Sequence, residues 1–304
     1  MINMGIPLKI DPQKPSHELY EDIDYRLFWS GWQQFKLDQA EHIVLRGLLP
    51  VSGRRLIDIG CGYGRLADCY LDRYDQVIMF DGSISLLRQA REYFGGKAVY
   101  VAGDLNRLPF RSASFDSAVM VRVFHHIMES EAFLKEINRI LSGSGLAIIT
   151  YNNKLYMVNV LKWLIHPTPN SPFSMEPSGI GTTIISHHPS YVKQILLQSG
   201  FTNLQFRGLG VLDRLANKIG LLGRFTPTGV CLAPFFGKVL IAPWNFCRAV
   251  AKHNPPLVES SKIEDILECI TCRGKLRNQV SGFTCLSCGR YYPIIEGIFD
   301  FRPK

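Results

Sequence analysis

The stretch that most constrains the fold is residues 55–65, which read Arg-Leu-Ile-Asp-Ile-Gly-Cys-Gly-Tyr-Gly-Arg. Its first five residues form a short apolar run with one acid, as is typical of a buried parallel strand. Glycines then occupy positions 60, 62 and 64, and residues 66–71 have helical spacing. A strand that passes through a glycine turn into a helix places bare backbone N–H groups beside a ligand. The stretch therefore predicts an α/β fold with a binding site at the carboxyl end of this strand.

The spacing of the glycines argues against a dinucleotide as the ligand. A dinucleotide fingerprint, Gly-x-Gly-x-x-Gly, would need its third glycine at position 65, which is Arg65. Asp58 lies two residues before the first glycine, where a carboxylate would repel a pyrophosphate and attract a cation. S-adenosylmethionine (SAM) has no phosphate and carries an ammonium and a sulfonium group. The pattern Asp-x-Gly-x-Gly-x-Gly resembles motif I of the class I SAM-dependent methyltransferases.

Acidic residues also follow the next two predicted strands. Asp81 follows a predicted strand at 76–80, and Asp104 follows one at 98–102. A carboxylate at the tip of the second strand is well placed to hold a ribose diol. Two further runs resemble motifs of the same family, in particular of its UbiE-like type: Gly103-Asp-Leu-Asn-Arg-Leu-Pro-Phe110 and Ser114-Phe-Asp-Ser-Ala-Val-Met-Val121. The resemblance extends over roughly residues 20–245.

The resemblance implies a fold and a set of cofactor-binding residues. The fold is α/β, a doubly wound, mostly parallel sheet of seven strands, with helices that we expect at 84–94, after an N-cap at Ser83, and at 131–141. In the family, the counterpart of Asp104 accepts a hydrogen bond from the adenine amino group, and the apolar residue after it packs on the ring. The residues expected to bind SAM are Asp58, Gly60, Cys61, Gly62, Gly64, Asp81, Gly82, Asp104, Leu105 and Val121.

Methyl transfer is an in-line displacement, so the enzyme mainly positions the reactants and excludes water. A base is needed only if the acceptor holds its proton at the working pH. Residues 121–127 face the methyl group in this family, and here they lack the Asn/Asp-Pro-Pro-Tyr/Phe motif of the N-methylases that act on nucleobases or glutamine. His125 and His126 are candidate bases, although the family commonly has a histidine here for packing. Arg122 is a candidate to steer an anionic acceptor or to pair with a nearby acid.

Four of the eight cysteines form two Cys-x-x-Cys pairs: Cys269 with Cys272, and Cys285 with Cys288. Each pair presents two thiolates from one turn, and two such turns complete a tetrahedron around Zn²⁺. We therefore expect a structural zinc site that supplies much of the folding free energy of a small C-terminal unit. Two redox-active pairs are the alternative interpretation.

The residues after the last cysteine add a second resemblance. Residues 289–298, Gly-Arg-Tyr-Tyr-Pro-Ile-Ile-Glu-Gly-Ile, are similar to the zinc-ribbon family whose stand-alone members activate RNA and protein methyltransferases. Glu296 and Phe299 stand where that family usually has Asp and often has Pro. The resemblance implies a ribbon that stabilises the methyltransferase domain or docks its substrate within the same chain.

The net charge of +8 is unevenly distributed. Residues 1–150 carry 17 basic and 18 acidic side chains, whereas residues 151–260 carry 10 and 3. Within that basic part, residues 208–250 mix aromatic and basic side chains, and three interpretations stay open. Residues 239–242 favour a seventh strand with flanking helices. The mixture could also bind nucleic acid by stacking and phosphate neutralisation, or rest on a membrane surface and reach a lipid-like substrate.

The predicted organisation is a flexible arm at 1–19, a methyltransferase domain at 20–250, a linker at 251–262 and a zinc-ribbon domain at 263–304. The large domain is expected to begin with a helix at 20–49 and to carry insertions at about 152–186 and 208–236. The first of them lies where the family keeps substrate-selecting segments. Candidate lid residues on the first helix are Tyr20, Tyr25 and Trp29.

No apolar run is long enough to span a membrane, and the amino terminus lacks the features of a secretory signal. Together with the cysteine pairs, this favours a cytoplasmic protein. We expect a SAM-dependent methyltransferase with a structural zinc ribbon and an acceptor among RNA, proteins and small molecules. The alternatives are a SAM-binding scaffold that recruits a partner through the ribbon, and a methyltransferase that acts on a lipid or isoprenoid acceptor at the membrane surface.

Overall fold

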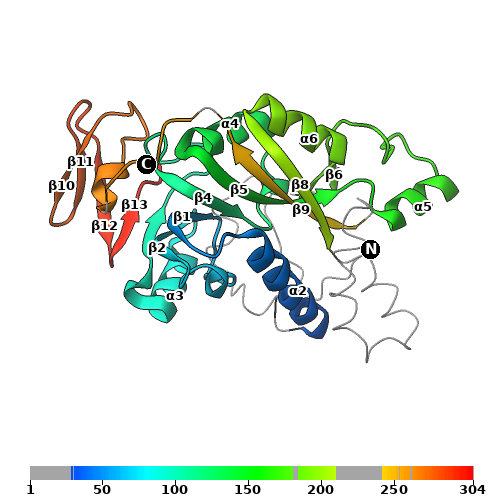
Figure 1. The fold of residues 1–304 in the computed structure, drawn as a ribbon, viewed down its shortest axis with the longest axis horizontal. Coiled ribbons are helices and arrows are strands. Elements are labelled where there is room, and N and C mark those ends of the chain that lie inside the picture. The colour runs from blue at the N-terminus through cyan, green and yellow to red at the C-terminus, as the bar shows by residue number, and fades with distance from the viewer. Residues whose placement is uncertain are drawn as a thin grey trace.

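The computed structural model describes residue 29 and residues 31–180, 184–209, 242–252, 254–260 and 262–303 (Figure 1). The predictions for the arm at 1–19, for Tyr20 and Tyr25, and for most of the second insertion lie outside these residues. Within them, one continuous β-sheet runs through the molecule, with helices on both of its faces. This is the α/β arrangement that the sequence predicts.

The centre of the sheet has the strand order expected of a methyltransferase. Parallel strands lie in the order β3-β2-β1-β4-β5, followed by β9, which is antiparallel to β5, and β8, which is antiparallel to β9. Their bounds are β1 Gly53–Ile59, β2 Tyr74–Asp81, β3 Val99–Ala102, β4 Phe115–Met120, β5 Leu141–Asn153, β8 Phe201–Leu209 and β9 Trp244–Ala251. The prediction of a mostly parallel, seven-stranded sheet is confirmed for this central part.

Alternate residues of β1 show why both faces of the sheet are covered. Ile57 and Ile59 belong to a core that includes α4 and α6, whereas Leu56 belongs to a second core with α2 and α3, on the other side in Figure 1. Because both faces are buried, the central strands are apolar almost throughout. The predicted N-cap is confirmed, since Ser83 Oγ accepts from the Leu86 N–H at 3.2 Å. The helices are α2 Trp32–Leu48, α3 Ile84–Phe94, α4 Ser130–Ile140, α5 Met157–Ile165 and α6 Pro189–Gln198.

The helix predicted directly after the glycine turn is wrong. Residues 66–71 contain only a short 3-10 turn at Ala67–Cys69. The Ala67, Cys69 and Tyr70 N–H groups donate to the carbonyls three residues before them, at 3.0 to 3.1 Å. Bonds of this spacing make 3-10 turns rather than an α-helix. The Tyr70 hydroxyl, which bonds Asp58, ties the end of this segment to β1.

The last strand of the central sheet also differs from its prediction. The strand expected at 239–242 is found at Trp244–Ala251, and residues 239–241 lie outside the described part. Ala242 and Pro243 precede this strand; Pro243 has no N–H to donate to a ladder, which makes it a poor strand residue. The strand pairs with β5 from Trp244 opposite Asn152 to Val250 opposite Leu146.

The first insertion is partly regular. It contains α5 and a hairpin of β6 Ser178–Ile180 and β7 Ile184–His187, and β7 runs parallel to the end of β5. Among the described helices, none combines the length and the apolar character that crossing a membrane would require.

The C-terminal residues extend the same sheet at its opposite edge. Strand β13 runs parallel to β3, and β12, β11 and β10 follow in antiparallel order. Part of the predicted linker is bonded to the large domain: the Val258 N–H donates to the Ala113 carbonyl at 2.9 Å, and the Asn254 amide donates to the Leu141 carbonyl at 2.7 Å. The domain boundaries themselves stay a prediction. The strand bounds are β10 Leu276–Gln279, β11 Gly282–Cys285, β12 Tyr291–Ile295 and β13 Ile298–Asp300.

Candidate active site and four-cysteine cluster

The carboxyl ends of β1, β2 and β3 meet around one cavity. Parallel strands present these ends at a single edge, so residues far apart in the sequence share it. Of the residues predicted to bind SAM, all but Gly64 line the cavity. Its other lining residues are Trp29, Tyr63, Arg65, Leu66, Leu86, Gly103, Arg122, Val123 and His126.

The glycine turn brings the backbone close to this cavity. Gly60 and Gly64 have φ angles of +71° and +81°, which favour glycine. A Cβ on Gly60 would lie 2.3 Å from Val123 Cγ2, and a Cβ on Gly64 would lie 2.6 Å from the Phe94 ring. Gly60 therefore keeps the cavity wall open, whereas Gly64 lets the turn pack against the end of α3.

Asp58 is the most deeply buried acid of the cavity, with 4% of its surface exposed. The Tyr70 hydroxyl donates a hydrogen bond to Asp58 Oδ2. Burial outweighs this hydrogen bond and, together with the charge of Asp81, raises the pKa of Asp58 from its ordinary 3.8 to about 7. A cation bound beside the carboxyl would lower this pKa again, so the site favours a positively charged ligand.

The other two acids are fixed by hydrogen bonds from the backbone. The Gly62 N–H donates to Asp81 Oδ2 at 2.8 Å, and the Ser83 N–H donates to Asp81 Oδ1 at 2.9 Å. Asp104 Oδ1 accepts from the backbone N–H and the side-chain amide of Asn106, at 2.9 and 3.1 Å. An ionised carboxylate has about four acceptor sites, so both side chains can also accept hydrogen bonds from a ligand.

A charged network that the sequence analysis missed forms part of the cavity wall. Glu41 of α2 is buried, and it accepts hydrogen bonds from Arg65 Nη2 and Arg122 Nε, both at 2.6 Å. The Arg65 guanidinium lies 3.8 Å from the centre of the Trp29 ring, and that of Arg122 lies 3.6 Å from the Trp244 ring. Burial alone would raise the pKa of Glu41, but the two arginines outweigh it and hold the pKa below its ordinary 4.5.

The sequence does contain an indication that Glu41 is buried and paired. It falls on the same face of α2 as Leu45 and Leu48, which are buried, so an acid there needs a buried partner. Arg122 is such a partner, which agrees with one of the two roles expected of it. Its backbone has a φ of +65°, a conformation that is costly for residues other than glycine and that clusters at functional sites.

The two candidate bases differ in position. His126 lines the cavity, whereas His125 does not and is 6% exposed. Burial, with the nearby charges of His126 and Arg122, lowers the pKa of His125 well below its ordinary 6.5. The His125 ring centre lies 4.0 Å from that of His126 and 5.1 Å from that of Trp244. His125 is therefore neutral at pH 7 and packs among rings, and His126 is the candidate base that lines the cavity.

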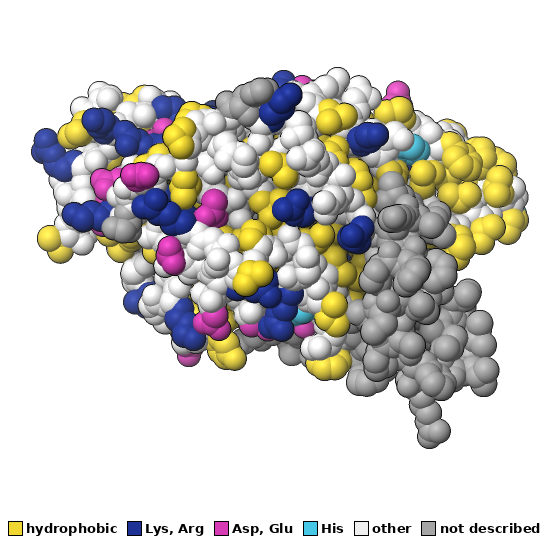
Figure 2. All heavy atoms as spheres, in the orientation of Figure 1, with side chains coloured by type: hydrophobic (Ala, Val, Ile, Leu, Met, Phe, Trp, Pro, Cys, Tyr) yellow, Lys and Arg dark blue, Asp and Glu magenta, His cyan; other side chains and the backbone are white. Residues whose placement is uncertain are grey.

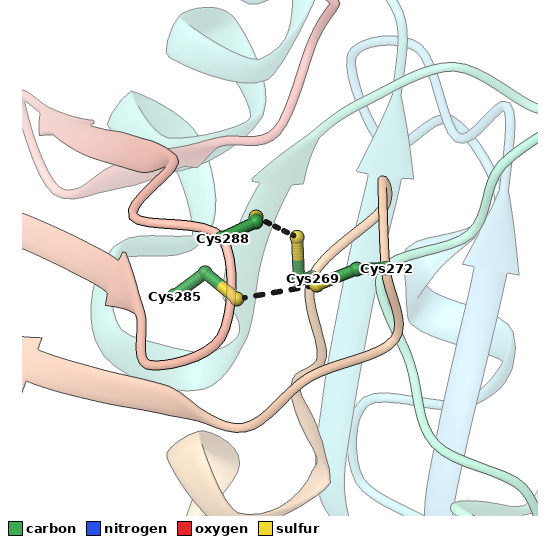
Figure 3. A group of neighbouring side chains, drawn as sticks. All are labelled: Cys269, Cys272, Cys285 and Cys288. Atoms are coloured by element: carbon green, nitrogen blue, oxygen red, sulfur yellow. Dashed lines mark hydrogen bonds between the residues drawn. The ribbon is translucent and has the colours of Figure 1, made fainter.

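The side chains of the four paired cysteines converge, as Figure 3 shows: Cys269 and Cys272 lie in one loop, and Cys285 and Cys288 lie at the end of β11 and in the turn after it. Cys269 Sγ lies 3.6 Å from Cys288 Sγ, and Cys272 Sγ lies 3.4 Å from Cys285 Sγ. Zn–S bonds of about 2.3 Å in a tetrahedron place sulfur atoms about 3.8 Å apart, so the donor set and spacing fit this ion. Burial would raise the pKa of Cys269, but hydrogen bonds from the Tyr292 hydroxyl and backbone amides outweigh it and lower the pKa to about 6.

The cysteine cluster is bonded to the segment that carries Asp104. The Phe301 N–H donates to the Ala102 carbonyl at 2.7 Å, at the end of β3. Beyond Asp104, the Leu108 carbonyl accepts from Arg273 Nη1 at 2.9 Å. The ribbon therefore supports the edge strand and the loop at one end of the cavity.

Comparison with known proteins agrees with this geometry. A family model described as a methyltransferase domain matches residues 57–149. The O-methyltransferase cnsE of Penicillium expansum is 30% identical over 201 residues, which cover 64% of this chain and 67% of that protein. A solved complex between the Haloferax volcanii Trm112 methyltransferase activator and a methyltransferase includes a chain with a TM-score of 0.53 and 19% identity, covering 74% of this chain and 96% of that one.

The strand order and the acid-lined cavity define a Rossmann-like methyltransferase fold. The chain belongs to the class I SAM-dependent methyltransferases of the UbiE-like type, and its C-terminal four-cysteine cluster is consistent with a zinc ribbon. It spans about half the length of another relative, an S-adenosylmethionine-dependent methyltransferase of Mycobacterium tuberculosis: the two are 30% identical over 135 residues, which cover 44% of this chain and 46% of that protein.

Proposed function

We propose that this protein transfers the methyl group of SAM to an acceptor among RNA, proteins and small molecules, and that a structural Zn²⁺ in its ribbon supports the fold. The observation that carries the proposal is the cavity shared by Asp58, Asp81 and Asp104. SAM has a cationic methionine part, a ribose diol and an adenine amino group, and each of them suits a carboxylate. The described cysteines are all free, which supports a cytoplasmic location for a thiolate-bound metal.

In this proposal, each acid has a distinct role. Asp81 holds the ribose hydroxyls while it keeps its two backbone hydrogen bonds, and Asp104 accepts from the adenine amino group, with Leu105 packed on the ring. Asp58 and the N–H groups of the glycine turn lie towards the methionine part. The buried carboxyl of Asp58 becomes fully ionised when the positive charge of SAM lies beside it.

Bound SAM supplies an electrophilic methyl group on its sulfonium. The chain's own residues position the acceptor in line with that group and exclude water from it. Val121 and Arg122 belong to this wall of the cavity, and the pair between Arg122 and buried Glu41 keeps the wall in place. His126 would take the proton of an acceptor that is protonated at the working pH.

The ribbon is proposed to act on the methyltransferase domain within one chain. The methyltransferase of Haloferax volcanii was solved in complex with a separate activator, Trm112. Here β13 already occupies the free edge of β3, so the ribbon can supply comparable support in cis. Its four thiolates would hold Zn²⁺ with no open position, as in a structural site.

The test is incubation of the purified protein with methyl-tritiated SAM and with RNA, protein or lipid fractions of the source cell. We expect label in one class of acceptor. Asp104→Ala should raise the KM for SAM about tenfold, because one charge-assisted hydrogen bond is worth roughly 1.5 kcal/mol. The matched control is Asp75→Ala, which changes an exposed acid at the other end of β2. Absence of label in every fraction, with SAM bound, would support the scaffold alternative instead.

A further inference from the structure

A second group of metal-ligating side chains lies apart from the ribbon, between α2 and the connection that follows the glycine turn. Its members are His42 of α2, and Asp68 and Cys69 of the short 3-10 turn. Their ligand atoms lie within 4.8 Å of one another. On the face drawn in Figure 2, basic, acidic and histidine side chains gather where α2 lies in Figure 1. The described residues that line the SAM cavity are others, so this group is separate from that site.

The oxygen atoms around His42 indicate a cation beside its ring. Nδ1 lies 2.8 Å from the Asp38 carbonyl oxygen, and Nε2 lies 3.2 Å from the Arg65 carbonyl oxygen and 3.1 Å from Asp68 Oδ1. A neutral imidazole has one N–H, so the nitrogen that lacks it turns a lone pair towards oxygen lone pairs. When Nδ1 donates to a backbone carbonyl, as is usual for metal-binding histidines, Nε2 is left for a cation that it shares with Asp68.

Cys69 favours a metal ion over a second proton as this cation. The side chain is buried, and its Sγ lies 3.7 Å from Asp68 Oδ1. A proton on His42 would account for the histidine and the carboxylate, but it would give the thiol no part. Thiolate, imidazole and carboxylate together suit Zn²⁺ or Co²⁺ rather than Ca²⁺ or Mg²⁺. Tetrahedral bonds of about 2.0 to 2.3 Å place such ligand atoms about 3.3 to 3.7 Å apart, close to the 3.1 and 3.7 Å found here.

The charges of the group also fit a divalent ion. Asp68 Oδ2 accepts from Arg46 Nη2 at 2.7 Å, which holds the carboxylate with Oδ1 towards His42. Burial, together with the charge of Asp68, raises the pKa of the Cys69 thiol to about 12, so without a metal the thiol stays neutral and donates to the carboxylate. A divalent ion would displace this proton to solvent, and the thiolate and the carboxylate would then balance its two charges.

We infer that His42, Asp68 and Cys69 form a second transition-metal site, suited to Zn²⁺, with water in the remaining position. Three mixed ligands bind less tightly than four thiolates, so we expect the site to fill when metal is added to a protein that already holds its ribbon ion. A bound ion would tie α2 to the segment whose Tyr70 bonds Asp58. Any effect on SAM binding therefore rests on the proposed function, whereas metal binding itself does not.

The experiment is titration of Co²⁺, a spectroscopic substitute for Zn²⁺, into the full chain purified with its ribbon ion. The wild type should bind one further ion per chain and develop the absorption bands of thiolate-bound Co²⁺. Asp68→Asn should weaken this binding about a hundredfold or more, because even the loss of an outer-shell partner costs about ten- to a hundredfold in metal affinity. The Asp68 side chain is 57% exposed, so its replacement should leave the fold intact. The matched control is Asp72→Asn, which changes an exposed acid on the same connection and should bind as the wild type does.

Cys69→Ser separates this site from the ribbon. It should remove the thiolate bands, whereas Co²⁺ that had replaced the ribbon ion would give them in the wild type and in Cys69→Ser alike. Equal Co²⁺ affinity of Asp68→Asn and Asp72→Asn, bands that persist in Cys69→Ser, or no further ion bound by the wild type would each overturn the inference, and the cation beside His42 would then be a proton. The titration contains no SAM, so a failure of methyl transfer leaves its result intact.

Discussion

Replacement of Asp58 by asparagine should stabilise the protein without ligand at neutral and alkaline pH. The fold raises the pKa of Asp58 from 3.8 to about 7, mainly through burial. Each pKa unit corresponds to about 1.4 kcal/mol, so ionising this carboxyl in the fold costs about 4 kcal/mol more than in the unfolded chain. Asparagine has a similar shape, can still accept from the Tyr70 hydroxyl and never ionises.

The sign of the pH dependence follows from the proton count. Between about pH 4 and pH 7 the folded protein holds a proton on Asp58 that the unfolded chain has released, so wild-type stability falls as the pH rises through this window. From pH 5 to pH 8, the wild type should lose about 3 kcal/mol of unfolding free energy relative to Asp58→Asn.

The assay is urea unfolding of both proteins at pH 5 and pH 8, with Asp75→Asn as the control for removal of an exposed acid from β2. The control should show no comparable change between the two pH values. A stability difference between wild type and Asp58→Asn that is the same at pH 5 and pH 8 would refute the reasoning. Despite its higher stability, Asp58→Asn should bind SAM more weakly, because the cation loses its buried counter-charge.

Three other outcomes are expected. Glu41→Gln should lower the unfolding free energy by about 3 kcal/mol in urea titrations, since two partly buried arginines lose their shared counter-ion; an unchanged midpoint would show that the network contributes nothing. Cys285→Ser should reduce bound zinc, measured by plasma mass spectrometry, from about one ion per chain to nearly none and lower the thermal midpoint, whereas Ser287→Ala, between the ligands, should retain the metal. Wild-type SAM affinity should rise between pH 6 and pH 8, as Asp58 ionises more readily, and a flat pH profile would contradict its assigned role.

The strands and the cavity could be predicted because their causes are local. Strands buried on both faces are apolar almost throughout, and the acids at their ends stand next to glycines or turns. The positions of Asp58, Asp81 and Asp104 therefore predicted that they share one edge of the sheet. The structure brings all three to one cavity.

Other features depend on distance or on distant partners, and the sequence does not display them. The helical spacing of residues 66–71 does not show that Tyr70 bonds the buried carboxyl of Asp58, which lies on β1. The pairing of β13 with β3 joins segments about two hundred residues apart, which no local pattern encodes. Glu41 is an intermediate case: its position on the apolar face of α2 was visible, but its partners Arg65 and Arg122 come from other elements.

The most direct test of the account is calorimetric titration of SAM into the wild type and Asp81→Ala, with Asp75→Ala as the control. Asp81 is placed to hold the ribose diol through charge-assisted hydrogen bonds, so its loss should weaken binding about a hundredfold, while the control binds as the wild type does. No heat of binding in the wild type, or equal affinities in the wild type and Asp81→Ala, would contradict the claim that the acids at the strand ends form the SAM site.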